Sequence, residues 1–130
     1  MIDFSRINHV GIRISNLAAS RAFYERLGFE FLAGPIGPEP VAIIEHPSGV
    51  NINFILNANQ GRKDNMLMRS KEKYTGYTHI ALEVADEAKT IRQLRDLGIP
   101  LSGEPFTHPG GTSFFVRDPD DNVIEFTVPK

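Results

Sequence analysis

Four polar residues occupy equivalent places in two similar halves of the chain. His9 and His79 each open a run of alternating apolar residues, 79 − 9 = 70 positions apart. Further on, Asn53 and Glu125 align at an offset of 125 − 53 = 72. The chain has no cysteine, so a bound metal would need histidine, carboxylate or amide oxygen ligands. A histidine buried in the core is the simpler interpretation of either residue alone, but two at equivalent positions favour a metal site.

The elements that carry these residues form an internal repeat. The pairs at the first offset are Val10 with Ile80, Ile12 with Leu82, Ile14 with Val84, Leu27 with Leu97, and Gly28 with Gly98. The pattern predicts two β-α-β-β-β modules, residues 5–57 and 77–128, in one domain of residues 1–130. Residues 58–76 are expected to link the modules, with or without a short helix at Met66–Met68.

The expected element boundaries follow from periodicity, caps and turn residues. In the first module we expect strands at 5–14, 29–32, 41–45 and 50–57, a helix capped by Ser15 and Asn16 and ended by Gly28, and a loop at 34–40. In the second we expect strands at 78–84, 99–102, 112–117 and 123–128, a helix from Asp86 to Leu97, and a loop at 103–111.

Strand alternation places the four polar residues on one kind of surface. Apolar neighbours such as Val10 and Ile80 should pack under a helix, so His9 and His79 point to the opposite face. The same parity applies to Asn53 and Glu125. If the helix-free faces of the two modules curve together, all four side chains point into a partly open, barrel-like cavity with the helices outside.

Composition excludes several classes of function. The net charge of −2 and the lack of a basic stripe argue against a nucleic-acid partner. No apolar run approaches the length of about 20 residues that spans a bilayer, and the first residues do not resemble a signal peptide. We therefore expect a cytoplasmic protein that binds a small molecule.

The motifs resemble the vicinal oxygen chelate superfamily, which includes glyoxalase I, bleomycin-resistance proteins and extradiol dioxygenases. The resemblance rests on the duplication and on three segments: Phe23-Tyr24-Glu25-Arg26-Leu27-Gly28, Gly76-Tyr77-Thr78-His79-Ile80-Ala81, and Asp118-Pro119-Asp120 followed by Ile124-Glu125-Phe126. It implies an α+β glyoxalase-like fold, most similar to bacterial glyoxalase I, and a homodimer.

The resemblance also implies a ligand set. Metal-dependent members take their ligands from the first and fourth strands of each module, which are the places of His9, Asn53, His79 and Glu125 here. Glyoxalase I would have glutamate in place of Asn53. The implied set is therefore His9, His79 and Glu125 around one divalent ion (nickel, zinc, manganese or iron), with Asn53 either a weak fourth ligand or a plain polar residue.

Three functions remain open on this scaffold. The first is a lactoylglutathione lyase type of lyase or isomerase that acts through an enediolate, with Glu125 as the catalytic proton carrier and with Arg13 and Asn57 holding the substrate. The second is an iron(II) extradiol-type dioxygenase. The third is a bleomycin-resistance-like binding protein without catalysis. His108 is expected to be a loop residue without a catalytic role, and the acidic turn at Asp118, Asp120 and Asp121 is expected to be only a turn.

Overall fold

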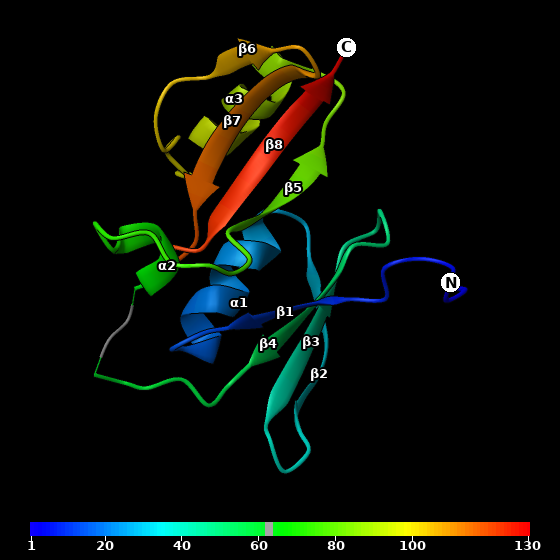
Figure 1. Ribbon diagram of the computed structural model, residues 1–130, viewed down its shortest axis with the longest axis vertical. Helices are drawn as coiled ribbons and strands as arrows, with labels where there is room; N and C mark the ends of the chain where they lie inside the picture. Colours follow the sequence, from blue (N-terminus) through cyan, green and yellow to red (C-terminus); the bar gives the residue numbers. More distant parts are fainter. Residues whose placement is uncertain (62–63) are drawn as a thin grey trace. The chain divides into compact units, whose positions relative to one another are not determined.

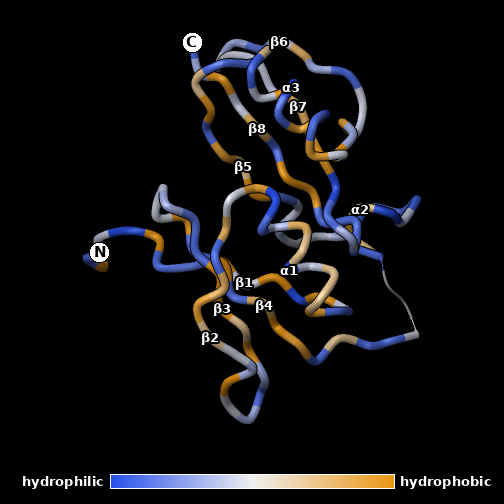
Figure 2. The backbone as a smooth tube through the Cα atoms, turned by 180° about the vertical axis from the view of Figure 1, so that it is seen from behind, coloured by the Kyte–Doolittle hydropathy of each residue, from blue (hydrophilic) through white to orange (hydrophobic). Residues whose placement is uncertain are grey.

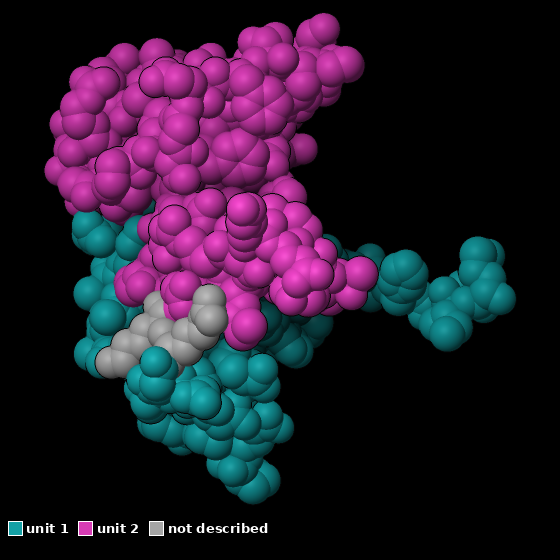
Figure 3. All heavy atoms as spheres, turned by 60° about the vertical axis from the view of Figure 1, so that its left-hand side comes forward, with its two compact units in different colours: residues 1–63 teal, residues 64–130 magenta. Residues whose placement is uncertain are grey.

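The computed structural model describes residues 1–61 and 64–130, and the chain divides into two compact units, residues 1–63 and 64–130 (Figure 3). Unit 1 contains β1 (Val10–Arg13), α1 (Leu17–Arg26), β2 (Glu30–Ile36), β3 (Val41–Glu45) and β4 (Asn51–Ile55). Unit 2 contains α2 (Met66–Arg69), β5 (His79–Glu83), α3 (Glu87–Asp96), β6 (Phe106–His108), β7 (Gly111–Arg117) and β8 (Val123–Pro129).

The two sheets have the same topology, which confirms the predicted duplication and the α+β class (Figure 1). Unit 1 has the strand order β1-β4-β3-β2 and unit 2 the order β5-β8-β7-β6. In each, the first strand runs parallel to the last, and the remaining pairs are antiparallel. Parallel pairing needs a crossover connection, and the rest of the module, which includes α1 or α3, separates each parallel pair.

The helices begin where the sequence predicts. Asn16 accepts a hydrogen bond from the Ala19 amide at the start of α1, and Asp86 accepts one from the Lys89 amide at the start of α3. These bonds satisfy amides that have no partner within the helix. Gly28 follows α1 with a φ of 101°, a conformation that glycine adopts without a steric penalty.

Each unit has an apolar core on the helix side of its sheet. In unit 1, Tyr24 of α1 packs against Phe54 of β4 with ring centroids 5.4 Å apart, and both side chains are buried. In unit 2, Leu94 of α3 and the β7 and β8 residues Phe114 and Phe126 are buried. Figure 2 shows hydrophobic colour along β3, β4, β7 and β8.

The outer strands correct two predictions. Gly34 and Pro35 were expected in a loop but lie in β2, which is an edge strand, where a residue without an N–H is tolerated. A Cβ at Gly34 would lie 2.5 Å from Ala42 Cα, so this close approach needs glycine. The strand expected at 99–102 is absent from the described structure, and β6 forms instead at Phe106–His108 within the expected loop.

The first strand is also shorter than expected, because β1 begins at Val10. His9 therefore immediately precedes β1, whereas His79 is the first residue of β5. In the predicted linker, α2 forms at Met66–Arg69 and belongs to unit 2. None of the helices in residues 1–61 and 64–130 is long and apolar enough to cross a membrane.

Candidate functional site

The two histidines have matching surroundings, each within its own unit. His9 Nδ1 lies 2.8 Å from Asn8 Oδ1, and His79 Nδ1 lies 2.8 Å from Thr78 Oγ1. Asn8 and Thr78 are themselves equivalent in the repeat, since 78 − 8 = 70. Because Asn8 Oδ1 can only accept, the proton of a neutral His9 ring lies on Nδ1 and leaves a lone pair on Nε2, which is the form that binds a metal.

His79 and Glu125 meet on the helix-free face of unit 2. Their strands, β5 and β8, are parallel neighbours, and Ala81 is the direct partner of Glu125. His79 is two residues earlier on the same face, and its Nε2 lies 3.1 Å from Glu125 Oε1. The sequence parity argument placed both residues on this face, and the structure shows that they are in contact there. His9 belongs to unit 1, so its place in a common ligand set stays a prediction.

The Glu125 carboxyl group is half-buried but well supplied with donors. Burial alone would raise its pKa, but hydrogen bonds from Thr127 and Ser113 and the nearby rings of His79 and His108 hold the pKa below its ordinary value. Ser113 Oγ donates to Glu125 Oε2 at 2.9 Å, and Thr127 Oγ1 donates to the same oxygen. The side chain is therefore an ionised carboxylate at neutral pH.

Sequence analysis assigned neither of two neighbours of Glu125 to the site. Ser113 of β7 is fully buried, and His108 of β6 has Nε2 2.7 Å from Ser113 Oγ. The parity of β7 already placed Ser113 opposite the buried residues Phe114 and Val116, which is the signal that could have found it. His108 carried no such signal, because β6 was not predicted and its residues were read as a loop.

Arg13 and Asn57, the two residues expected to hold the substrate, come together in unit 1. Arg13 Nε donates to Asn57 Oδ1 at 3.0 Å, and Asn57 Nδ2 donates to Glu39 Oε1 at 3.0 Å. Glu39, in the β2–β3 connection, was not predicted. The Asn57 amide is oriented from both sides, with its oxygen toward the cation and its nitrogen toward the carboxylate.

Asn53 lies on β4 between Gly11 of β1 and Ile43 of β3, and is half-buried. Within the described part of the chain, its side chain forms no hydrogen bond with another residue. It therefore keeps its amide oxygen available, as a weak ligand or as a polar residue on this face.

An aromatic surface adjoins the His79–Glu125 pair. Phe115, the β7 partner of Glu125, lies 6.2 Å from the His79 ring centroid and stacks with Phe106 of β6 at 6.0 Å. Phe106 is 49% exposed. Its ring also lies 5.4 Å from that of His108.

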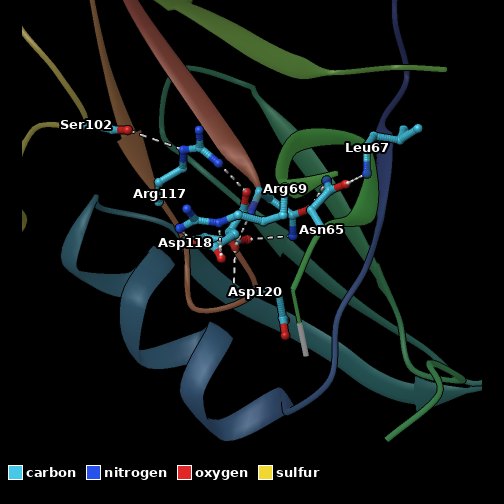
Figure 4. A network of polar contacts seen from close by, with 9 residues as sticks. Asn65, Leu67, Arg69, Ser102, Arg117, Asp118 and Asp120 are labelled. Atoms are coloured by element: carbon cyan, nitrogen blue, oxygen red, sulfur yellow. Dashed lines mark hydrogen bonds and ion pairs between the residues drawn. The ribbon is translucent and has the colours of Figure 1, made fainter. Parts of the chain in front are cut away.

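The acidic turn between β7 and β8 is stabilised by hydrogen bonds within unit 2 (Figure 4). The Asp118 carboxylate accepts hydrogen bonds from the amides of Asp120 and Asn122 and from the Asn122 side chain. Arg69 of α2 pairs with Asp121 through two contacts of 2.7 Å, and the Asn65 amide donates to the Asp120 carbonyl. The turn thus holds the start of unit 2 in place.

Among the described residues, no group of three or more acidic, histidine or cysteine side chains gathers as a complete metal site. The His79–Glu125 pair nevertheless fits one edge of such a site. Two ligand atoms that each lie about 2.1 Å from one ion are about 3.0 Å apart in octahedral geometry and about 3.4 Å apart in tetrahedral geometry, and the observed separation of 3.1 Å lies between these values.

The sequence-family model of the Glyoxalase/Bleomycin resistance protein/Dioxygenase superfamily matches residues 6–126 of this chain. This chain belongs to that superfamily. The matched residues cover both modules except the end of β8, and they include His9, Asn53, His79 and Glu125.

Several solved structures of other proteins share the fold. A glyoxalase family protein from Enterococcus faecalis is 26% identical, with a TM-score of 0.77 and coverage of 95% of this chain and 98% of that one. TnmS3, an antibiotic binding protein from Streptomyces sp. CB03234, is 19% identical over all of both chains, with a TM-score of 0.76. The fosfomycin resistance protein FosX from Listeria monocytogenes is 16% identical, with a TM-score of 0.72 and coverage of 98% and 94%. No curated protein matches the sequence.

Proposed function

We propose that this superfamily member is a metal-dependent lyase or isomerase of the glyoxalase type, acting on a substrate with two adjacent oxygens. The supporting observation is the 3.1 Å contact between His79 Nε2 and Glu125 Oε1. In this proposal His9, His79 and Glu125 hold one divalent ion, with Asn53 near it as a weak or absent ligand. Members of the superfamily commonly use such an ion.

The protein's own residues support the ligand roles. Asn8 and Thr78 hold Nδ1 of the two histidines and direct Nε2 toward a ligand. The lowered pKa of Glu125 keeps its carboxylate charged, as metal binding requires. When bound, the ion would stabilise negative charge that develops on the substrate oxygens.

Glu125 is also the proposed proton carrier between the neighbouring carbons of the substrate. Ser113 and Thr127 both donate to Oε2, so Oε1 is the oxygen that would hold the ion and, when it is not bound to the ion, would receive the proton. A carboxylate with a lowered pKa is a weak base, so its placement close to the substrate must compensate for its low basicity. Arg13, oriented by Asn57, would bind a carboxylate of the substrate through its terminal N–H groups.

Elemental analysis of untagged protein tests the metal site. We expect about one divalent ion per chain, and loss of that ion in His9→Ala and in His79→Ala. The matched control is His46→Asn. His46 lies in the β3–β4 turn, where its Nδ1 accepts a hydrogen bond from the Ser48 amide. The side-chain oxygen of asparagine can accept the same bond. No ion in the wild type after incubation with nickel, zinc, manganese or iron(II) would contradict the proposal.

The aromatic surface favours a second candidate, the binding of an aromatic small molecule without turnover. Stacked Phe106 and Phe115 offer a flat apolar surface beside the polar pair, and the neighbouring structure TnmS3 is described as an antibiotic binding protein. Calorimetry with a panel of aromatic antibiotics tests it. Binding that needs no metal and is lost in Phe106→Ala would favour this candidate over catalysis.

A further inference from the structure

A chain of hydrogen bonds runs across three neighbouring strands of unit 2 and ends on Glu125. His108 is on β6, Ser113 on β7, and Thr127 and Glu125 on β8. The register pairs Phe106 with Ser113 and Ser113 with Thr127, so these positions share one sheet face. Alternation puts His108 and Glu125 on this same face, which is the face opposite α3.

The direction of the chain follows from counting donors. The Gly110 amide donates to His108 Nδ1 at 3.1 Å, so Nδ1 must carry a lone pair. The proton of the neutral ring is then on Nε2, which donates to Ser113 Oγ at 2.7 Å. The single hydroxyl proton of Ser113 is given to Glu125 Oε2 at 2.9 Å. Each group thus donates toward the carboxylate.

Two glycines make this arrangement sterically possible. A Cβ at Gly110 would lie 3.2 Å from His108 Cε1, which is tighter than ordinary contact. A Cβ at Gly111, where φ is 141°, would lie 2.0 Å from the Val128 carbonyl oxygen. The His108-Pro109-Gly110-Gly111 segment therefore brings a backbone N–H to the imidazole and keeps β7 close to β8.

The first module lacks this support. At the offset of 72, Ser113 corresponds to Val41 and Thr127 to Ile55, since 113 − 72 = 41 and 127 − 72 = 55. Val41 and Ile55 are indeed paired across β3 and β4, as Ser113 and Thr127 are across β7 and β8. The hydroxyl groups of Ser113 and Thr127 thus lie beside the Glu125 carboxylate. The apolar side chains of Val41 and Ile55 take the equivalent positions beside Asn53.

We propose that His108 is a positioning residue: acting through Ser113, it holds Oε2 of Glu125 so that Oε1 is presented beside His79 Nε2. The expected effect on metal binding rests on the proposed function, because Oε1 is the oxygen that would bind the ion. The hydrogen-bond chain itself is independent of that function. Residues that orient a metal-binding carboxylate typically alter metal affinity by about 10- to 100-fold when removed.

The first test is made on metal-free protein by long-range nitrogen–proton NMR of the imidazole rings at neutral pH. We expect the proton of the neutral His108 ring to be on Nε2, and we expect Ser113→Ala to change the Nε2 signal. A His108 ring with its proton on Nδ1, or one unaffected by Ser113→Ala, would overturn the proposal whether or not the protein binds metal.

The second test measures affinity for manganese(II) by calorimetry. We expect His108→Ala and Ser113→Ala to weaken binding by about 10- to 100-fold, and His108→Gln to restore much of it because the glutamine amide can donate to Ser113. His46→Asn is the matched control and should leave affinity unchanged. If His108→Ala binds manganese(II) as tightly as the wild type, the positioning role is wrong and the proposed function is unaffected. If the wild type binds no ion, the proposed function is wrong, and the NMR experiment alone decides whether His108 positions Glu125.

Discussion

His79 Nε2 lies 3.1 Å from Glu125 Oε1, although the two residues are 46 positions apart in the chain (125 − 79 = 46). The contact forms because β5 and β8 are parallel neighbours and because both residues point away from α3. Glu125 is held from the other side by Ser113 and Thr127. The pair is thus a fixed combination of an imidazole and an ionised carboxylate on one sheet face.

Replacement of Glu125 by glutamine should abolish the proposed isomerase activity. The amide cannot take up the substrate proton, and loss of a positioned acid–base group typically costs about 10²- to 10⁴-fold in rate. The assay follows conversion of the hemithioacetal of methylglyoxal and glutathione. Glu83→Gln, on the same strand as His79 and exposed, is the control that should retain activity. Full activity in Glu125→Gln would contradict the mechanism.

Stability should fall in acid because two carboxylates have lowered pKa values in the folded protein. The hydrogen bond from Arg69 lowers the pKa of Asp121 below its ordinary value of 3.8. Burial would raise the pKa of Glu125, but hydrogen bonds from Thr127 and Ser113 outweigh it and lower this pKa below its ordinary value of 4.5. The unfolded chain therefore binds these protons more readily than the folded one, so the stabilisation is complete above pH about 4.5 and is lost as the pH falls through the folded values.

Urea unfolding from neutral pH down to about pH 3 measures this effect. The free energy of unfolding should drop less steeply in Glu125→Gln and in Asp121→Asn than in the wild type, since each variant lacks one of the two groups. Identical pH profiles in all three proteins would contradict the assignment.

Arg69 should hold α2 against the β7–β8 turn within unit 2. Its guanidinium makes two 2.7 Å contacts with Asp121, and α2 has only four residues, too few to be stable alone. In Arg69→Ala we expect faster hydrogen exchange of the Arg69 and Ser70 amides, which donate to Asn65 and Met66 carbonyls. Lys71→Ala, two residues away, is the control, and unchanged exchange in Arg69→Ala would show that the Asn65 contacts suffice.

The core of unit 1 should depend strongly on Phe54. This side chain is fully buried against Tyr24, so Phe54→Ala should cost about 3–5 kcal/mol in the free energy of unfolding. Leu32→Ala is a matched apolar control in the same unit, because Leu32 is 52% exposed and its loss should cost about 0.5 kcal/mol or less. Denaturant unfolding of both variants makes the comparison, and equal costs would be inconsistent with this core.

Much of the fold was predictable because its signals are local. Asn16 and Asp86 cap the helices, Gly28 and Gly98 follow them, and apolar alternation marks β4, β5 and β8. The outer strands were mispredicted because Gly34, Pro35 and the glycines around β6 resemble loop residues. An edge strand tolerates them since one side of its backbone forms no sheet hydrogen bonds.

The sequence by itself determined the duplication, the superfamily and the face on which His79 and Glu125 point, because strand alternation and a repeat offset are properties of order along the chain. Only the tertiary structure decided which residues on that face touch. His108 reaches Glu125 through Ser113 because the register of β6, β7 and β8 brings the three together. A register depends on pairing between distant segments, and no local pattern around His108 encodes it.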